Sequence, residues 1–167
     1  MSKEWTSKKI LVLGLGNDLL SDDALGIRVV RELKRRLSGR DDLEFREASV
    51  AGLALLDWVC GYQNLIVVDA IKTQGGKPGD IYRLSEDSLP GNISQLCAHG
   101  LGLRTVLELG RKCGACIPEK VVIYAVEVEN VHTWRRGFTH RVQRAIPIVT
   151  EMILREELCD DTLPLVS

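Results

Sequence analysis

Three short apolar runs constrain the fold of this 167-residue chain more than any other feature. They cover residues 9–14, 64–70 and 120–126, and each is a nearly unbroken series of aliphatic and β-branched residues. Continuous apolar runs of this length are typical of strands that are buried on both faces of a parallel sheet. The segments between the runs are then expected to supply the helices that cover the sheet.

Helical patterns do alternate with these strands. After the first run, apolar residues recur at helical spacing, with Ser21 as the expected N-cap and Gly39 as the expected stop. Pro147 is expected to kink or divide the last helix. The predicted helices cover 21–37, 53–59, about 99–111 and 135–158, and two further strands are predicted at 43–48 and 81–84. The alternation predicts one three-layer α/β/α domain over residues 1–167, with a mainly parallel sheet and a core of about 9–158.

Composition restricts the class of protein. The chain is 45% hydrophobic and 27% charged, as in globular domains. Its net charge of −1 gives no electrostatic reason to expect binding to nucleic acid or to an anionic membrane. No apolar run approaches the roughly 20 residues that span a bilayer, and the first residues, MSKEWTSKK, lack the apolar core of a signal peptide. We therefore expect a cytoplasmic protein that binds neither nucleic acid nor membrane.

The cysteines do not indicate a disulfide framework, because their number is odd and the cytosol keeps thiols reduced. Cys60 is expected to pack as a small apolar side chain. Cys113 and Cys116 form one CxxC pair, but a structural zinc site usually needs four ligands and the chain has no second pair. We expect the pair to lie in a turn between a helix and a strand, with a redox or metal role as the alternative.

Three potential metal ligands lie where the fold would bring them together. Asp23 follows the first strand, Asp69 ends a central strand, and His99 lies at the start of a later helix. Ligands of open α/β sheets bind beyond the carboxyl ends of the strands, so these side chains are expected at one edge. Two carboxylates and an imidazole can bind a first-row transition metal with open positions. The carboxylates could equally act as acid and base, or activate a water molecule.

The segment GLGNDLLSDDALG, residues 14–26, also suggests dinucleotide binding. The fingerprint needs a third glycine, however, where this chain has Leu19. Asp22 and Asp23 would themselves occupy the positive end of the helix dipole and repel a pyrophosphate. Glu47, at the end of the second strand, could still bind a ribose, so a nucleotide-binding oxidoreductase is an alternative.

Neighbouring polar residues have simpler explanations. Asp22 is expected to complement the helix dipole, Asp18 to be a solvated loop residue, and Asn17 to hold the turn through its own side chain. His132 and His140 are interpreted as surface residues. A cysteine nucleophile at Cys97, two residues before the loop histidine, is a further alternative without support from any motif.

Four sequence blocks together resemble the hydrogenase maturation proteases. They are ILVLGLGNDLLSDDALGIRVV, SVAGLALLDW, LIVVDAI followed by GGKPGDIYRL, and AHGLGL, and they occur in the family's order over residues 9–157. The resemblance implies an endopeptidase that trims the C-terminal extension from the large subunit of nickel-iron hydrogenase, with a three-layer α/β fold and a twisted sheet. It places the family's metal-binding acids on Asp23 and Asp69 and its histidine on His99. Ala24 departs from the glycine of many members.

The resemblance also implies how the site works. Asp23, Asp69 and His99 would engage nickel that the hydrogenase large-subunit precursor supplies, so no permanent cofactor is expected. Asp23 or Asp69 would activate the attacking water. The precursor is the expected partner, and the enzyme is expected to be a monomer. A non-catalytic nickel-binding chaperone of the same precursor would use the same three residues and is the alternative.

Overall fold

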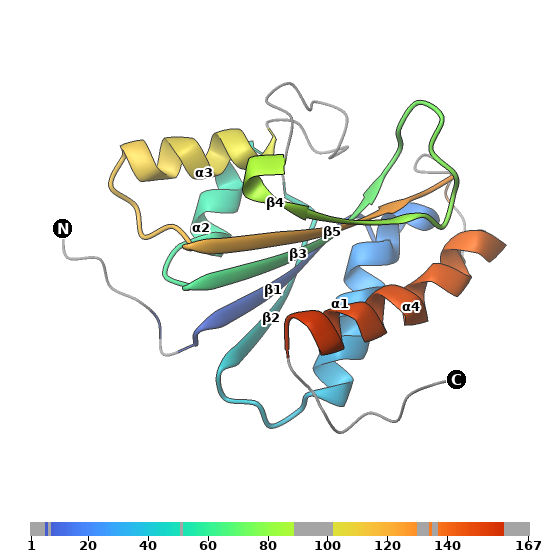
Figure 1. The fold of residues 1–167 in the computed structure, drawn as a ribbon, viewed down its shortest axis with the longest axis horizontal. Helices are drawn as coiled ribbons and strands as arrows, with labels where there is room; N and C mark the ends of the chain where they lie inside the picture. Colours follow the sequence, from blue (N-terminus) through green and yellow to red (C-terminus); the bar gives the residue numbers. More distant parts are fainter. Residues whose placement is uncertain are drawn as a thin grey trace.

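The computed structural model describes residues 6, 8–50, 52–88, 102–129, 134 and 137–158. The five strands that it describes form one sheet in the order β2-β1-β3-β5-β4 (Figure 1). The pairs β1–β2, β1–β3 and β3–β5 are parallel, and the edge strand β4 is antiparallel to β5. The strands are β1 (Ile10–Leu15), β2 (Leu43–Ala48), β3 (Asn64–Ile71), β4 (Ile81–Ser85) and β5 (Lys120–Glu127). The prediction of a mainly parallel sheet is confirmed.

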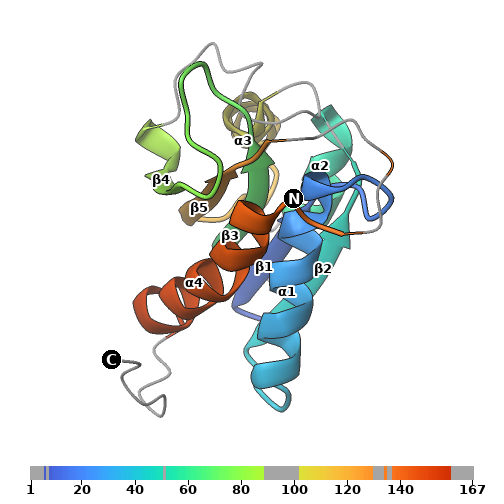
Figure 2. The same cartoon turned by 90° about the vertical axis from the view of Figure 1, so that its right-hand side faces the viewer.

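Helices cover both faces of this sheet. Figures 1 and 2 show α1 and α4 on one face and α2 and α3 on the other. The helices are α1 (Leu25–Arg36), α2 (Leu55–Val59), α3 (Leu103–Lys112) and α4 (His140–Glu156). Each face has its own cluster of buried apolar side chains. The predicted three-layer α/β/α architecture is therefore confirmed.

The central strands are continuously apolar because both of their faces are buried. Successive side chains of a strand point to opposite faces. Val12 and Val68 accordingly join the core under α1 and α4, whereas Leu11 and Val67 join the core under α2 and α3. Burial of one such side chain contributes roughly 1.5–3 kcal/mol, so the two cores can stabilise a sheet of this size.

The last helix differs from its prediction in two ways. It begins at His140 rather than at residue 135, and it continues through Pro147 without being divided. An interior proline costs a helix about 3 kcal/mol. A buried stripe outweighs this cost, because each of its valine, isoleucine and leucine side chains contributes roughly 1.5–3 kcal/mol. The stripe consists of Val142, Ala145, Ile146, Val149, Ile153 and Leu154.

The predicted first helix is also divided, into a 3-10 turn, η1 (Asp22–Ala24), followed by α1. Ser21 is the N-cap residue of η1, as predicted, but its side chain makes no capping bond. Its hydroxyl instead donates a hydrogen bond to the carbonyl oxygen of Gly137 at 3.0 Å. The third helix begins at Leu103, and the predicted start at residue 99 lies outside the described residues.

Cys113 follows α3 and is exposed, while Cys60 and Cys116 are partly buried. The CxxC pair thus lies in a turn between a helix and a strand, as predicted. His140, the first residue of α4, is exposed, which confirms its interpretation as a surface residue, and His132 lies outside the described residues. Among the described segments, no helix is long and apolar enough to cross a bilayer.

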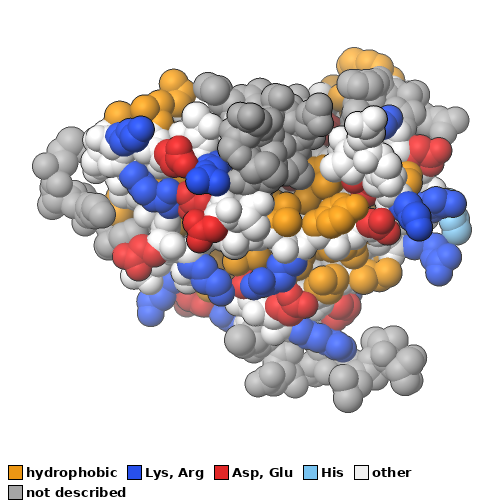
Figure 3. All heavy atoms as spheres, turned by 45° about the horizontal axis from the view of Figure 1, so that its top comes forward, with side chains coloured by type: hydrophobic (Ala, Val, Ile, Leu, Met, Phe, Trp, Pro, Cys, Tyr) orange, Lys and Arg blue, Asp and Glu red, His pale blue; other side chains and the backbone are white. Residues whose placement is uncertain are grey.

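The surface mixes charged and apolar groups. On the face drawn in Figure 3, hydrophobic side chains gather beside acidic and basic ones. Large exposed apolar side chains are informative when they cluster, because contiguous apolar patches mark binding surfaces. Within the described part of the chain, the large apolar side chains that are exposed are Leu19, Leu53, Leu109, Trp134 and Ile148.

Candidate active site

Two carboxylates lie buried at the carboxyl edge of the sheet, the edge that faces the viewer in Figure 2. Asp23 belongs to η1, which follows β1, and Asp69 lies near the end of β3. Their exposed fractions are 3% and 1%. The turn η1 packs against β3, so the fold brings the two segments together, as expected for adjacent parallel strands.

Two glycines allow the turn to approach the strand ends. Gly16 has a φ of +147°, and a Cβ at this position would lie 2.0 Å from the carbonyl oxygen of Asp23. A Cβ on Gly26 would lie 2.3 Å from the carbonyl oxygens of Leu15 and Val68. Only glycine fits at such close backbone contacts. Gly26, which the sequence analysis did not single out, thus holds the start of α1 against β1 and β3.

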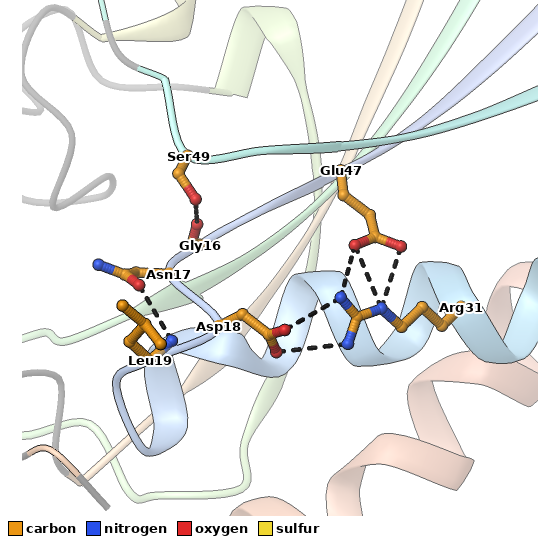
Figure 4. Close-up of polar contacts among 7 residues, drawn as sticks. All are labelled: Gly16, Asn17, Asp18, Leu19, Arg31, Glu47 and Ser49. Carbon is orange, nitrogen blue, oxygen red and sulfur yellow. Dashed lines mark hydrogen bonds and ion pairs between the residues drawn. The ribbon is translucent and has the colours of Figure 1, made fainter.

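The loop after β1 is also bonded to the end of β2. Ser49 donates its hydroxyl to the carbonyl oxygen of Gly16 at 2.6 Å (Figure 4). The Gly16 N–H donates to the carbonyl oxygen of Ala48 at 3.1 Å. These bonds extend the contact between the two strands into the loop that leads to the carboxylates.

The sequence predicts that Asp22 complements a helix dipole, but in the structure its side chain also bonds to distant segments. The side chain is buried, and its Oδ1 accepts a hydrogen bond from the backbone N–H of Thr139 at 2.8 Å. Its Oδ2 accepts from the Thr139 hydroxyl at 3.0 Å and from the N–H of Glu129 at 3.3 Å. Thr139 is the N-cap residue of α4. Asp22 therefore joins the turn that carries Asp23 to α4 and to the chain after β5.

Polar side chains hold the outer part of the same loop (Figure 4). The side-chain oxygen of Asn17 accepts a hydrogen bond from the N–H of Leu19 at 3.0 Å, which confirms its predicted role in the turn. Arg31 bridges Asp18 and Glu47, with Nη2 at 3.0 Å and 2.8 Å from their oxygens. Asp18 is thus exposed but paired. The hydrogen bonds to Glu47 and then Asp18 raise the pKa of the Arg31 guanidinium.

The end of β5 contains a further buried carboxylate, Glu127, that the sequence analysis missed. It accepts hydrogen bonds from the Thr73 N–H at 2.6 Å and from the Thr73 hydroxyl at 2.8 Å. It therefore anchors the loop between β3 and β4. The available signal was its position, because Glu127 directly follows the third apolar run, and Asp69 likewise lies at the end of the second.

The structure brings together the segments of two predicted ligands but does not describe the third. Asp69 Oδ1 accepts a hydrogen bond from the Ala70 N–H at 2.8 Å, and its strand pairs with β5 at Ala125. His99, and Cys97 with it, lies outside the described residues. In the described ranges alone, no three His, Cys, Asp or Glu side chains form a group that could hold a metal ion.

The structure is thus an α/β domain with two buried carboxylates at the carboxyl edge of its sheet, the edge where α/β proteins bind their ligands. A family model described as hydrogenase maturation protease matches residues 27–156, most of the chain. The Hydrogenase 2 maturation protease of Escherichia coli (strain K12) is 33% identical over 147 residues, which cover 87% of this chain and 88% of that relative. The chain therefore belongs to the hydrogenase maturation protease family, and it is a peptidase.

Solved structures agree with this assignment. The hydrogenase maturating endopeptidase HybD from E. coli has a TM-score of 0.77 at 33% identity, over 88% of this chain and 90% of that chain. The NiFe hydrogenase maturation protease HycI from Thermococcus kodakarensis KOD1 has a TM-score of 0.68 at 20% identity, over 89% and 91% of the two chains, which shows a shared fold. Membership in a peptidase family replaces the oxidoreductase alternative, and Glu47, which that alternative assigned to a ribose, pairs with Arg31.

Proposed function

We propose that this peptidase removes the C-terminal extension of a nickel-iron hydrogenase large-subunit precursor. The observation that carries the proposal is the burial of Asp23 and Asp69 on adjoining elements of the carboxyl edge. Carboxylates in such a place can hold a metal-bound substrate or take a proton from water. The family assignment supplies the reaction class, peptide-bond hydrolysis.

In this proposal, Asp23, Asp69 and His99 engage nickel that is already bound in the precursor. Carboxylate oxygens and an imidazole nitrogen suit a first-row divalent ion, and three protein ligands leave positions for groups of the precursor. The nickel is then part of the substrate and not a permanent cofactor. His99 enters through its sequence motif, AHGLGL, because it lies outside the described residues.

Asp23 or Asp69 would also act as the general base. The carboxylate takes a proton from a water molecule, the water oxygen bonds to the scissile carbonyl carbon, and the carbon–nitrogen bond breaks as the nitrogen takes up a proton. The products are the trimmed subunit with a new carboxyl end and a released peptide with a new amino end. Binding to the substrate nickel would orient the scissile bond, and such positioning can supply several kcal/mol of the barrier reduction.

The experiment compares two forms of one precursor. Purified protein is mixed with nickel-loaded and with nickel-free large-subunit precursor, and the mass of the subunit is followed over time. We expect the nickel-loaded form to lose the mass of its extension and the nickel-free form to keep it. Equal cleavage of both forms would overturn the recognition of nickel. A stable complex without any loss of mass would overturn the protease function and favour the chaperone alternative.

A further inference from the structure

A groove of about 520 Å³ lies beside the turn that carries Asp23. Its volume is within the range of sites that bind small molecules or single side chains. The described residues that line it come from two separate segments of the chain, one before α1 and one before α4. They are Asp18, Leu19, Ser21, Ala24, Trp134, Gly137 and Phe138.

Hydrogen bonds hold the two walls of the groove together. Ser21 donates to the carbonyl oxygen of Gly137 at 3.0 Å, and Asp22 accepts from both the N–H and the hydroxyl of Thr139. The groove is therefore formed by the folded protein before any ligand binds. Preformed sites avoid part of the entropy cost of ordering on binding.

The walls expose large apolar side chains to solvent. Trp134 is 76% exposed and Leu19 is 60% exposed. Aromatic and aliphatic side chains in this arrangement are typical of surfaces that bind another protein, because their burial provides much of the binding energy. Among the described lining residues, the only carboxylate is Asp18, and it is paired with Arg31. The described lining, with its exposed Trp134 and Leu19, therefore favours an apolar ligand.

We infer that this groove binds an apolar stretch of the protein substrate, on one side of the peptide bond that is cleaved. The inference rests on the proposed function, since that function brings a polypeptide to Asp23. Ser21 and Ala24 line the groove and flank Asp22 and Asp23 in sequence, so a chain that reaches the carboxylates passes beside this surface. The groove thus determines which polypeptide is presented for cleavage, while the carboxylates perform the reaction.

The experiment measures binding and cleavage of the nickel-loaded precursor separately. The variants Leu19→Ser and Trp134→Ser remove exposed apolar side chains, so both are expected to fold. Each is expected to raise the Kd and the KM for the precursor about tenfold, the change that corresponds to a moderately important interface side chain. The kcat is expected to stay within about twofold of wild type, because neither side chain takes part in proton transfer.

Ile148→Ser is the matched control, since Ile148 is 55% exposed on α4 and does not line the groove. The control is expected to keep the wild-type KM. An unchanged KM in both groove variants, or an equal rise in the control, would overturn the inference while the protease function stands. If wild-type protein bound the precursor without cleaving it, the proposed function would fail, and weaker binding by the groove variants would still support the groove.

A second copy of this chain is the other candidate occupant. Sedimentation of wild type and Trp134→Ser at the assay concentration tests it, and we expect the same monomeric mass for both. Self-association that disappears in Trp134→Ser, with no change in KM, would overturn the inference.

Discussion

Asp22 and Thr139, 117 residues apart in sequence, are joined by two hydrogen bonds at the carboxyl edge of the sheet. The carboxylate accepts from the backbone N–H and from the hydroxyl of the same residue. Because Asp22 precedes Asp23 and Thr139 precedes α4, this contact sets the position of the candidate active-site turn relative to the helix layer. The groove beside Asp23 depends on the same contact.

Asp22→Asn is therefore expected to destabilise the protein. An amide keeps only one of the two accepting oxygens, so at least one partly buried donor of Thr139 or Glu129 loses its partner, which costs about 1–3 kcal/mol. Urea unfolding at neutral pH measures the change in free energy. Asp41→Asn, the same change at an exposed position, is the control and is expected to alter stability by less than about 0.5 kcal/mol. Equal stability of Asp22→Asn and wild type would contradict the structural role.

Asp23→Asn and Asp69→Asn test the proposed chemistry. Each change preserves shape but removes the charge that could hold the substrate nickel or take a proton from water. We expect kcat for cleavage of the nickel-loaded precursor to fall roughly 10²–10⁴-fold, the usual contribution of a general base. Asp57→Asn, on the exposed side of α2, should keep full activity. Full activity in both active-site variants would exclude these carboxylates from the reaction.

Gly26→Ala is expected to disturb the fold at the site. The added Cβ would lie 2.3 Å from two backbone oxygens, which cannot move aside as a flexible side chain can. We expect a loss of about 3 kcal/mol or more, at or above the upper end of overpacking effects. Gly39→Ala provides the comparison, because it meets no atom within 4 Å and has only the strain of its φ of +103°, about 1–2 kcal/mol. Thermal unfolding of both variants separates close packing from backbone strain, and equal losses would contradict the packing argument.

The free energy of unfolding is expected to depend on pH through Glu32. Hydrogen bonds from Arg35 and Arg36 lower the pKa of Glu32 to about 2 in the folded state, below the ordinary value of 4.5. A lowered pKa means that the stabilisation is complete above about pH 4.5 and is lost as the pH falls towards 2. Because these groups are partly exposed, Glu32→Gln should cost only about 0.5–1 kcal/mol at pH 7.

The measurement is urea unfolding of wild type and Glu32→Gln between pH 7 and pH 2. The difference between them is expected to narrow across the acid part of this range. Glu119→Gln, at an exposed position, should follow wild type throughout. A difference that stayed constant down to pH 2 would show that the ion pairs are not its source.

Thiol labelling tests the environment of the cysteines. Burial raises the pKa of the Cys60 thiol, which lowers its reactive thiolate fraction at neutral pH. Cys113 is exposed, so iodoacetamide should modify Cys113 well before Cys60. Peptide mass mapping over time measures both rates in the folded protein, and unfolding in denaturant should remove the difference. Faster labelling of Cys60 would contradict the described packing.

Much of the fold could be read from periodicity. The three apolar runs predicted β1, β3 and β5 to within one residue at either end, because side chains buried on both faces leave no place for polar residues. Helix boundaries were less predictable. Ser21 is at the predicted N-cap position, but its hydroxyl bonds to Gly137 and does not cap the turn. Local preference makes Pro147 a helix breaker, but the buried stripe of α4 keeps the helix continuous.

The residues of the candidate site also include some that the sequence could predict and some that it could not. Asp69 could be selected from the sequence because an acid at the end of a buried apolar run is costly unless the site uses it. Asp23 could be selected because it follows the first strand, at the same predicted edge, and because the family motif places an acid there. The hydrogen-bond partners of Asp22 and Glu127 could not be predicted from the sequence. Asp22 bonds to Thr139 and Glu127 to Thr73, and only the folded chain brings these distant residues together. The sequence by itself determined the strands and the layers, through patterns of burial that each segment carries alone, and it singled out the two acids by their positions after the strands and by the family motif. Only the tertiary structure decided which segments form the groove, because that depends on contacts between residues far apart along the chain.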